Sequence, residues 1–211
     1  MTASSLISKS RLEALSDGVY AVALTLLALD LKLPPLADPS SAALNAALAD
    51  LVPKGLVWLL SFWVASLYWL AQHRVLRQYA RLDERGLLLE LCQLALITLL
   101  PFSTALIGEH GDLVAASLIY SVHLSLLAVL SLLRVLRLSR RPDLRSREFE
   151  PGNLAVQLQR GWVVLGCTLA CVVLAFFVPS WNMLAMLGIV FRRRMRDSGV
   201  PEPGPSGERD E

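Results

Sequence analysis

Long runs of apolar residues, interrupted by few charges, dominate this chain of 211 residues. Residues 86–108 carry one charged side chain, Glu90, and residues 113–133 carry no charge apart from a possible one on His123. A helix of about 20 apolar residues crosses the roughly 30 Å hydrocarbon core of a bilayer. A helix on the surface of a soluble protein would show a polar stripe, and neither run has one. The pattern therefore predicts an all-α integral membrane protein.

Six membrane spans are expected in one domain, residues 1–196. They are residues 11–33, 54–77, 86–108, 112–137, 158–178 and 180–196. The sixth is the shortest, because its apolar part has only 11 residues and needs the arginines that follow to snorkel toward the interface.

The segments between and after the spans are more polar. Pro34 and Pro35 end the first span, since neither continues a helical ladder. Residues 40–53 predict a short amphipathic helix capped by Ser40 or Ser41, too short to cross. Residues 139–159 predict a charged linker, and residues 197–211 a disordered cytoplasmic tail.

The positions of the basic residues predict the orientation. With six spans and the N-terminus inside, all of the 20 Lys and Arg residues except Lys32 and Lys54 face the cytoplasm. Cytoplasmic loops of membrane proteins carry this excess of positive charge. We therefore expect both termini in the cytoplasm and a multi-pass protein of the cell membrane.

Signatures of soluble enzymes are missing from the sequence. It has no glycine-rich phosphate loop, zinc-binding helix motif or serine nucleophile elbow. Cys92, Cys167 and Cys171 sit inside apolar runs, where small packed thiols are the expected role. We expect no catalytic activity, no cofactor, no bound metal and no nucleic-acid partner.

Ionisable groups inside spans are costly and are functional candidates by default. Glu90 lies one turn inside the third span, where a solvated interfacial carboxylate is the favoured interpretation. Asp30 lies beside Lys32 near the outer end of the first span and is also expected at the interface. For His123 we favour a neutral side chain bonded to a neighbouring helix over a proton relay.

A polar cluster is expected where the inner ends of the first two spans meet. Trp69 and His73 are four residues apart and share a helix face. The residues that would form the cluster are Arg11, Ser16, Asp17, Trp69 and His73. A structural anchor between the two helices is the simpler interpretation, and direct contact with a solute is the alternative.

One face of the first span carries Gly18, Val22, Thr25 and Leu29, spaced by four, three and four residues, with Leu26 one turn beyond Val22. Four copies around a symmetry axis would form a narrow apolar tube, which gates by dewetting. A ring of Thr25 hydroxyls would supply its oxygen atoms. A helix-packing seam with a small residue for close approach is the competing interpretation.

Residues 11–29, RLEALSDGVYAVALTLLAL, resemble the signature of the transmembrane-protein-175 family of potassium channels. That signature is Arg, three residues, Phe, Ser and Asp, followed by an apolar helix with a Thr. The stretches YWLAQHRVL and LALITLLPFSTALIGEHGD also resemble this family, and the likeness covers most of residues 9–110. Leu15 replaces the usual Phe, which changes how the motif packs.

The resemblance implies roles for individual residues. The first helix would line the pore, with Val22 as the constriction and Leu26 and Leu29 as further apolar layers. Thr25 would contribute to selectivity, and Val22 is smaller than the family's usual Ile or Leu, which would widen the constriction. Arg11, Ser16 and Asp17 would form the polar motif against Trp69 and His73.

Prokaryotic members of the family carry a single six-helix repeat and form tetramers, so the resemblance implies a homotetramer with a central pore. The function expected is a modestly selective, potassium-permeable cation channel without a carbonyl-lined filter. Potassium ions and the lipid bilayer are its expected partners. The alternatives are a six-helix secondary transporter of a small cation or solute, and a membrane-embedded enzyme or assembly factor.

Overall fold

The computed structural model describes residues 8–36, 40–147 and 149–177. Its elements are α1 (Lys9–Leu26), the 3-10 turn η1 (Leu27–Asp30), α2 (Ser41–Gln78), α3 (Glu84–His110), α4 (Val114–Arg140), the 3-10 turn η2 (Pro142–Leu144) and α5 (Pro151–Phe177). Five of these helical stretches are long and apolar enough to cross a membrane. The predicted sixth span, residues 180–196, and the predicted tail, residues 197–211, lie outside the described residues.

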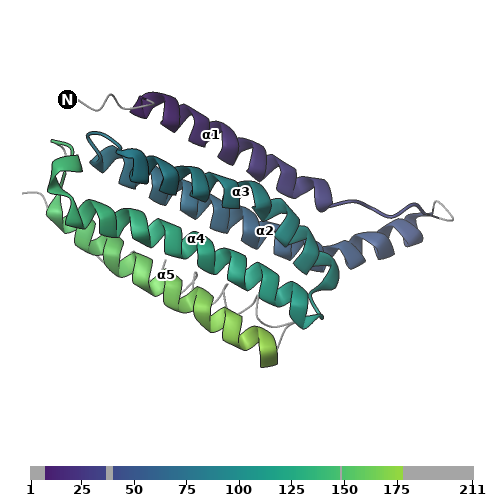
Figure 1. Cartoon of the computed structure of the whole chain (residues 1–211). Helices are drawn as coiled ribbons and strands as arrows, with labels where there is room; N and C mark the ends of the chain where they lie inside the picture. The colour runs from purple at the N-terminus through teal and green to yellow at the C-terminus, as the bar shows by residue number, and fades with distance from the viewer. Residues whose placement is uncertain (1–7, 37–39, 148, 178–211) are drawn as a thin grey trace, which may run out of the picture.

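The helices form an elongated bundle with α1 and α5 on opposite sides (Figure 1). α1 packs on α3 and α2, whereas α5 packs on α4. The core between them is apolar, with Leu60, Ile97, Leu100 and Leu127 almost fully buried. Because α1 lies at one side of the bundle, only one of its faces is covered by the described part of the chain.

α2 departs from the sequence-based prediction. The amphipathic segment and the second span form one helix of 38 residues, with Pro53 inside it. Its first turns project past the bundle (Figure 1). Ser40 caps it as predicted, accepting a bond from the Ala43 N–H at 3.2 Å. A proline removes one backbone hydrogen bond but does not always end a helix, since neighbouring groups can satisfy the freed carbonyl.

Two other boundaries also differ. α1 gives way at Leu27 to the 3-10 turn, which ends at Asp30, three residues before the predicted end of the span. Residues that precede a proline are pushed out of the helical region, which favours an extended approach to Pro34. α5 begins at Pro151, inside the predicted charged linker. Proline is favoured in the first turn of a helix, where its missing N–H has no helical partner to lose.

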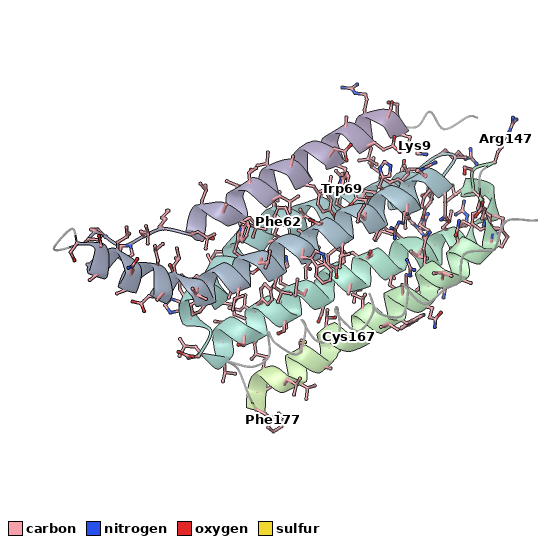
Figure 2. All side chains as sticks on the ribbon, turned by 180° about the vertical axis from the view of Figure 1, so that it is seen from behind. Lys9, Phe62, Trp69, Arg147, Cys167 and Phe177 are labelled. Carbon is pink, nitrogen blue, oxygen red and sulfur yellow. The ribbon has the colours of Figure 1, made fainter. Side chains whose placement is uncertain are left out.

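Basic side chains gather at one end of the bundle, the end that carries Lys9 and Arg147 (Figure 2). Lys9 donates to the Tyr79 carbonyl at 3.1 Å, which ties the start of α1 to the end of α2. Tyr79 and Arg145 form an antiparallel bridge between the loop after α2 and the loop before α5. Asp83, the N-cap of α3, pairs with Arg137 of α4. This charged end is the one that the sequence predicts to face the cytoplasm.

Candidate functional site

α1 has two different faces. Its buried residues are Leu12, Ser16, Tyr20 and Ala23, followed by Leu27 in η1. They recur every three or four residues, so they form one stripe along the helix. This stripe packs against α3 and α2 and fixes the rotation of α1 about its own axis.

The opposite face of α1 is uncovered. It carries Gly18, Val22 and Thr25, all exposed, with Leu26 at its margin, and the exposed Leu29 continues it in η1. A Cβ built at Gly18 would meet nothing within 4 Å. The Thr25 hydroxyl donates to the Val22 carbonyl at 2.8 Å, a bond within the helix that leaves the oxygen's acceptor capacity unused. The residues that the sequence predicts as pore-lining thus share one face, which is exposed in the described part of the subunit.

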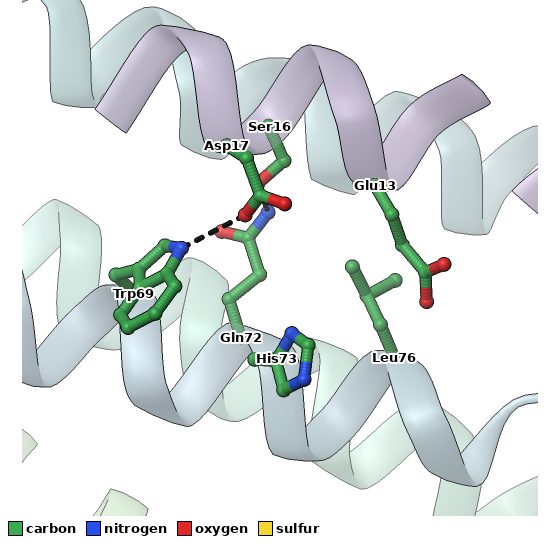
Figure 3. Close-up of a pocket in the computed structure, with 7 residues that line it drawn as sticks. All are labelled: Glu13, Ser16, Asp17, Trp69, Gln72, His73 and Leu76. Carbon is green, nitrogen blue, oxygen red and sulfur yellow. Dashed lines mark hydrogen bonds between the residues drawn. The ribbon is translucent and has the colours of Figure 1, made fainter. Parts of the chain in front are cut away.

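A polar site joins α1 to α2 (Figure 3). Trp69 donates its indole N–H to the Asp17 carboxylate at 2.9 Å. The ring of His73 lies 6.1 Å from that of Trp69, centroid to centroid. Ser16, which is buried, accepts a hydrogen bond from the Gln72 amide. Four of the five residues of the predicted cluster therefore line one pocket.

Arg11, the fifth residue, lies elsewhere. Its side chain is exposed and makes no hydrogen bond or ion pair with the rest of the described chain. It precedes Gly18 by seven residues, or two helical turns, so it shares the face of the uncovered stripe rather than the face of Asp17. Gln72, Glu13 and Leu76 complete the pocket instead. Sequence reasoning missed Gln72, although a glutamine one turn after Trp69 in an apolar span is itself a signal.

Glu90 is not a solvated interfacial carboxylate. Its carboxylate accepts two hydrogen bonds from the Arg134 guanidinium, at 2.8 and 2.7 Å, and both side chains are almost fully buried. A charge removed from water needs a close partner, and α4 supplies one. The prediction was wrong because Glu90 and Arg134 lie 44 residues apart in the sequence.

His123 makes hydrogen bonds to a neighbouring helix, as predicted. Its Nε2 lies 2.9 Å from the Leu96 carbonyl, which can only accept, so Nε2 carries the proton. Its Nδ1 lies 2.7 Å from the Ser103 hydroxyl. Both partners belong to α3, so His123 is a hydrogen-bonded link between α3 and α4.

Among the residues that the structure describes, no group of three or more His, Cys, Asp or Glu side chains is placed to hold a metal ion. The described residues thus form a bundle of helices long and apolar enough to cross a membrane, and its first helix presents an exposed stripe and a polar contact with α2.

One family model matches part of the chain. Residues 11–101 match the family model described as endosomal/lysosomal potassium channel TMEM175. The resemblance predicted from the sequence is therefore confirmed over this part of the chain.

The chain is similar to a potassium channel of Chamaesiphon minutus, with 38% identity over 100 residues that cover 47% of this chain and 49% of that protein. It is also similar to a potassium channel of Streptomyces collinus, with 37% identity over 100 residues that cover 47% and 48% of the two chains. The matched region thus spans about half the length of these relatives. Both are named as channels, in agreement with the expectation that this protein is not an enzyme.

The fold extends the likeness beyond the matched region. The crystal structure of a lysosomal potassium-selective channel TMEM175 homolog from Chamaesiphon minutus aligns with a TM-score of 0.77. That alignment covers 90% of this chain and 98% of the other, at 24% identity. The chain therefore shares the fold of that structure.

Proposed function

We propose that this protein is a potassium-permeable, modestly selective cation channel of the cell membrane. The observation that carries the proposal is the stripe of Gly18, Val22, Thr25 and Leu29, which faces away from every other helix described in the subunit. It is supported by the relatives, which are named potassium channels.

The proposed pore lies on the axis of a homotetramer, since one stripe cannot enclose a hole. Each subunit would have six spans and both termini in the cytoplasm. Val22 would form the constriction, and Leu26 and Leu29 further apolar layers. Such a constriction conducts only when water wets it. Thr25 would place oxygen atoms beside the permeating ion. Without a filter of backbone carbonyls, selectivity for potassium over sodium would be modest.

The polar site has a supporting role in this proposal. Ser16 and Asp17 would hold α1 against α2 through Gln72, Trp69 and the neighbouring His73, so that the stripe faces the axis. Arg11 would stand on the pore face at the inner mouth. A secondary transporter is not favoured, because the relatives are named as channels.

The test is planar-bilayer recording of the full-length protein with potassium on one side and sodium on the other. We expect unitary currents whose reversal potential shows a higher permeability for potassium than for sodium. Saturable uptake without unitary currents would contradict the proposal. Val22→Ala should raise unitary conductance or weaken discrimination. Val173→Ala on α5 is the matched control, because Val173 is 58% exposed and Val22 57%. Equal conductance and equal discrimination in the two variants would show that Val22 does not line the pore.

A further inference from the structure

Two loops at the charged end of the bundle are joined by a short stretch of antiparallel backbone pairing. Tyr79, which follows α2, and Arg145, which precedes α5, form its central bridge. Hydrogen bonds on either side of the bridge run from the Ala80 N–H to the Leu144 carbonyl and from the Ser146 N–H to the Gln78 carbonyl, both at 2.8 Å. These bonds fix which residue of one loop stands opposite which residue of the other.

The two ends of this pairing carry different charges. At one end, one residue beyond a bonded pair, stand Arg81 and Asp143, whose charged groups lie 3.8 Å apart. At the other end, again one residue beyond a bonded pair, the same register places Arg147 beside Arg77. The register that brings an acid to Arg81 thus brings a second arginine to Arg77.

Arg77 and Arg147 are exposed and lack an acidic partner. Neither makes a hydrogen bond or an ion pair within the described part of the chain. The helix dipole favours an arginine in the last turn of a helix, which accounts for Arg77. Arg147 lies outside the helices that the structure describes, at the charged end of the bundle (Figure 2). Two neighbouring positive charges repel each other, and a phosphate group, which guanidinium groups bind through paired hydrogen bonds, would relieve this repulsion.

The depth of these arginines in the membrane indicates where such a phosphate group comes from. On α2, Leu70 is 40% exposed, and Arg77 follows on the same face seven residues later. On α4, Leu133 is 42% exposed, and Arg140, also exposed, follows at the same spacing. Seven residues of helix rise about 10 Å, the step from the hydrocarbon core into the headgroup region. Both helices therefore place exposed aliphatic side chains against lipid tails and arginines at the level of lipid phosphates.

We propose that Arg77 and Arg147 bind the phosphate group of an anionic phospholipid in the leaflet at this end of the bundle, which the sequence predicts to be cytoplasmic. Arg74 and Arg140, both exposed, would strengthen the attraction from either side. A lipid is favoured over a soluble phosphate compound, because the face of α2 that carries Arg77 continues into the exposed Leu70, where an acyl chain can lie. The proposal concerns the membrane surface and does not depend on ion conduction.

The experiment titrates the full-length protein in detergent with phosphatidylglycerol and measures the first bound lipid by native mass spectrometry. Phosphatidylcholine with the same acyl chains is the comparison, because its choline group cancels the phosphate charge, and it should bind more weakly. Arg77→Gln and Arg147→Gln should each weaken phosphatidylglycerol binding about fivefold, the usual effect of one arginine at a membrane surface. The double variant should lose less than the product of the two, since both residues hold one phosphate group.

Arg81→Gln is the matched control. It removes the same charge from the other end of the same pairing, where Asp143 already balances it, so the affinity for phosphatidylglycerol should stay within about twofold of wild type. Equal losses for Arg81→Gln and Arg147→Gln would overturn the proposal, because net charge alone would then attract the lipid. Equal affinities of wild type for the two lipids would also overturn it.

Two further measurements complete the test. Glycerol phosphate, the soluble part of the lipid headgroup, should not displace phosphatidylglycerol at equal concentration, and displacement would assign the site to a soluble compound instead. Melting temperatures of the variants should equal that of wild type, because the side chains are exposed. If Arg147→Gln does not fold, Arg77→Gln must show the loss of lipid on its own, and unchanged binding there would refute the site.

Discussion

Trp69 donates its indole N–H to the carboxylate of Asp17 across 2.9 Å, and this bond joins α2 to α1 close to the charged end of the bundle. The residues are 52 positions apart in the sequence. The bond therefore holds the first helix to the second from outside the apolar core.

Trp69→Phe should lower stability by about 1 kcal/mol, the usual net contribution of one hydrogen bond. Trp58→Phe is the matched control on the same helix, because the Trp58 Nε1 is buried without a partner in the described chain. That change should be neutral or stabilising. Thermal unfolding in detergent, followed by circular dichroism, measures both, and equal losses would show that the Trp69 bond contributes nothing.

Thr25→Val should reduce the preference for potassium over sodium. The change keeps the shape of the side chain but removes its oxygen, and a lost contact of about 1 kcal/mol corresponds to a roughly fivefold smaller permeability ratio. Thr98→Val is the control, since Thr98 of α3 is also exposed and makes the same bond within its helix, to the Ala95 carbonyl at 2.7 Å. Reversal potentials under bi-ionic conditions measure the ratio. An unchanged ratio for Thr25→Val would exclude the hydroxyl from selectivity.

Asp83 should make stability depend on pH at the charged end of the bundle. Partial burial raises the pKa of Asp83, but hydrogen bonds from Arg137 and the Gly86 N–H, together with the Arg137 charge, outweigh it and hold the pKa below its usual value. A carboxyl group with a depressed pKa stabilises the fold above the unfolded pKa of about 3.9 and loses that effect as pH falls through the folded pKa.

The expected result is a difference in melting temperature between wild type and Asp83→Asn that is constant near neutral pH. The difference should shrink once the pH falls below about 4. Melting curves at a series of pH values measure it. A difference that persists unchanged into strong acid would mean that the Asp83 charge is not what stabilises this end.

Much of the fold could be predicted from the sequence, because hydropathy over 20 residues reports directly on the ability to cross a bilayer. The same pattern could not predict whether a helix continues through Pro53. A proline both removes a hydrogen bond and bends a helix, and only the packing around it decides whether the helix continues. The sequence therefore predicts two separate helices for the amphipathic segment and the second span, whereas the structure has one.

The candidate site was predictable where its residues share one helix. The stripe from Gly18 to Leu29 follows from helical periodicity alone, and the structure places it on one uncovered face. The partner of Glu90 was not predictable. A carboxylate within a span indicates that some group must balance its charge, but not which residue supplies that group. Arg134 lies near the end of an apolar run, where a snorkelling side chain is the ordinary expectation.

The central claim is that the exposed stripe of α1 lines a potassium pore. Its most direct test is the accessibility of Val22→Cys to a charged thiol reagent during single-channel recording. The protein should lack Cys92, Cys167 and Cys171, and Val173→Cys on α5 should serve as the control. The account predicts that the reagent blocks potassium current through Val22→Cys and leaves Val173→Cys unaffected. Unblocked current in fully modified Val22→Cys protein would contradict it.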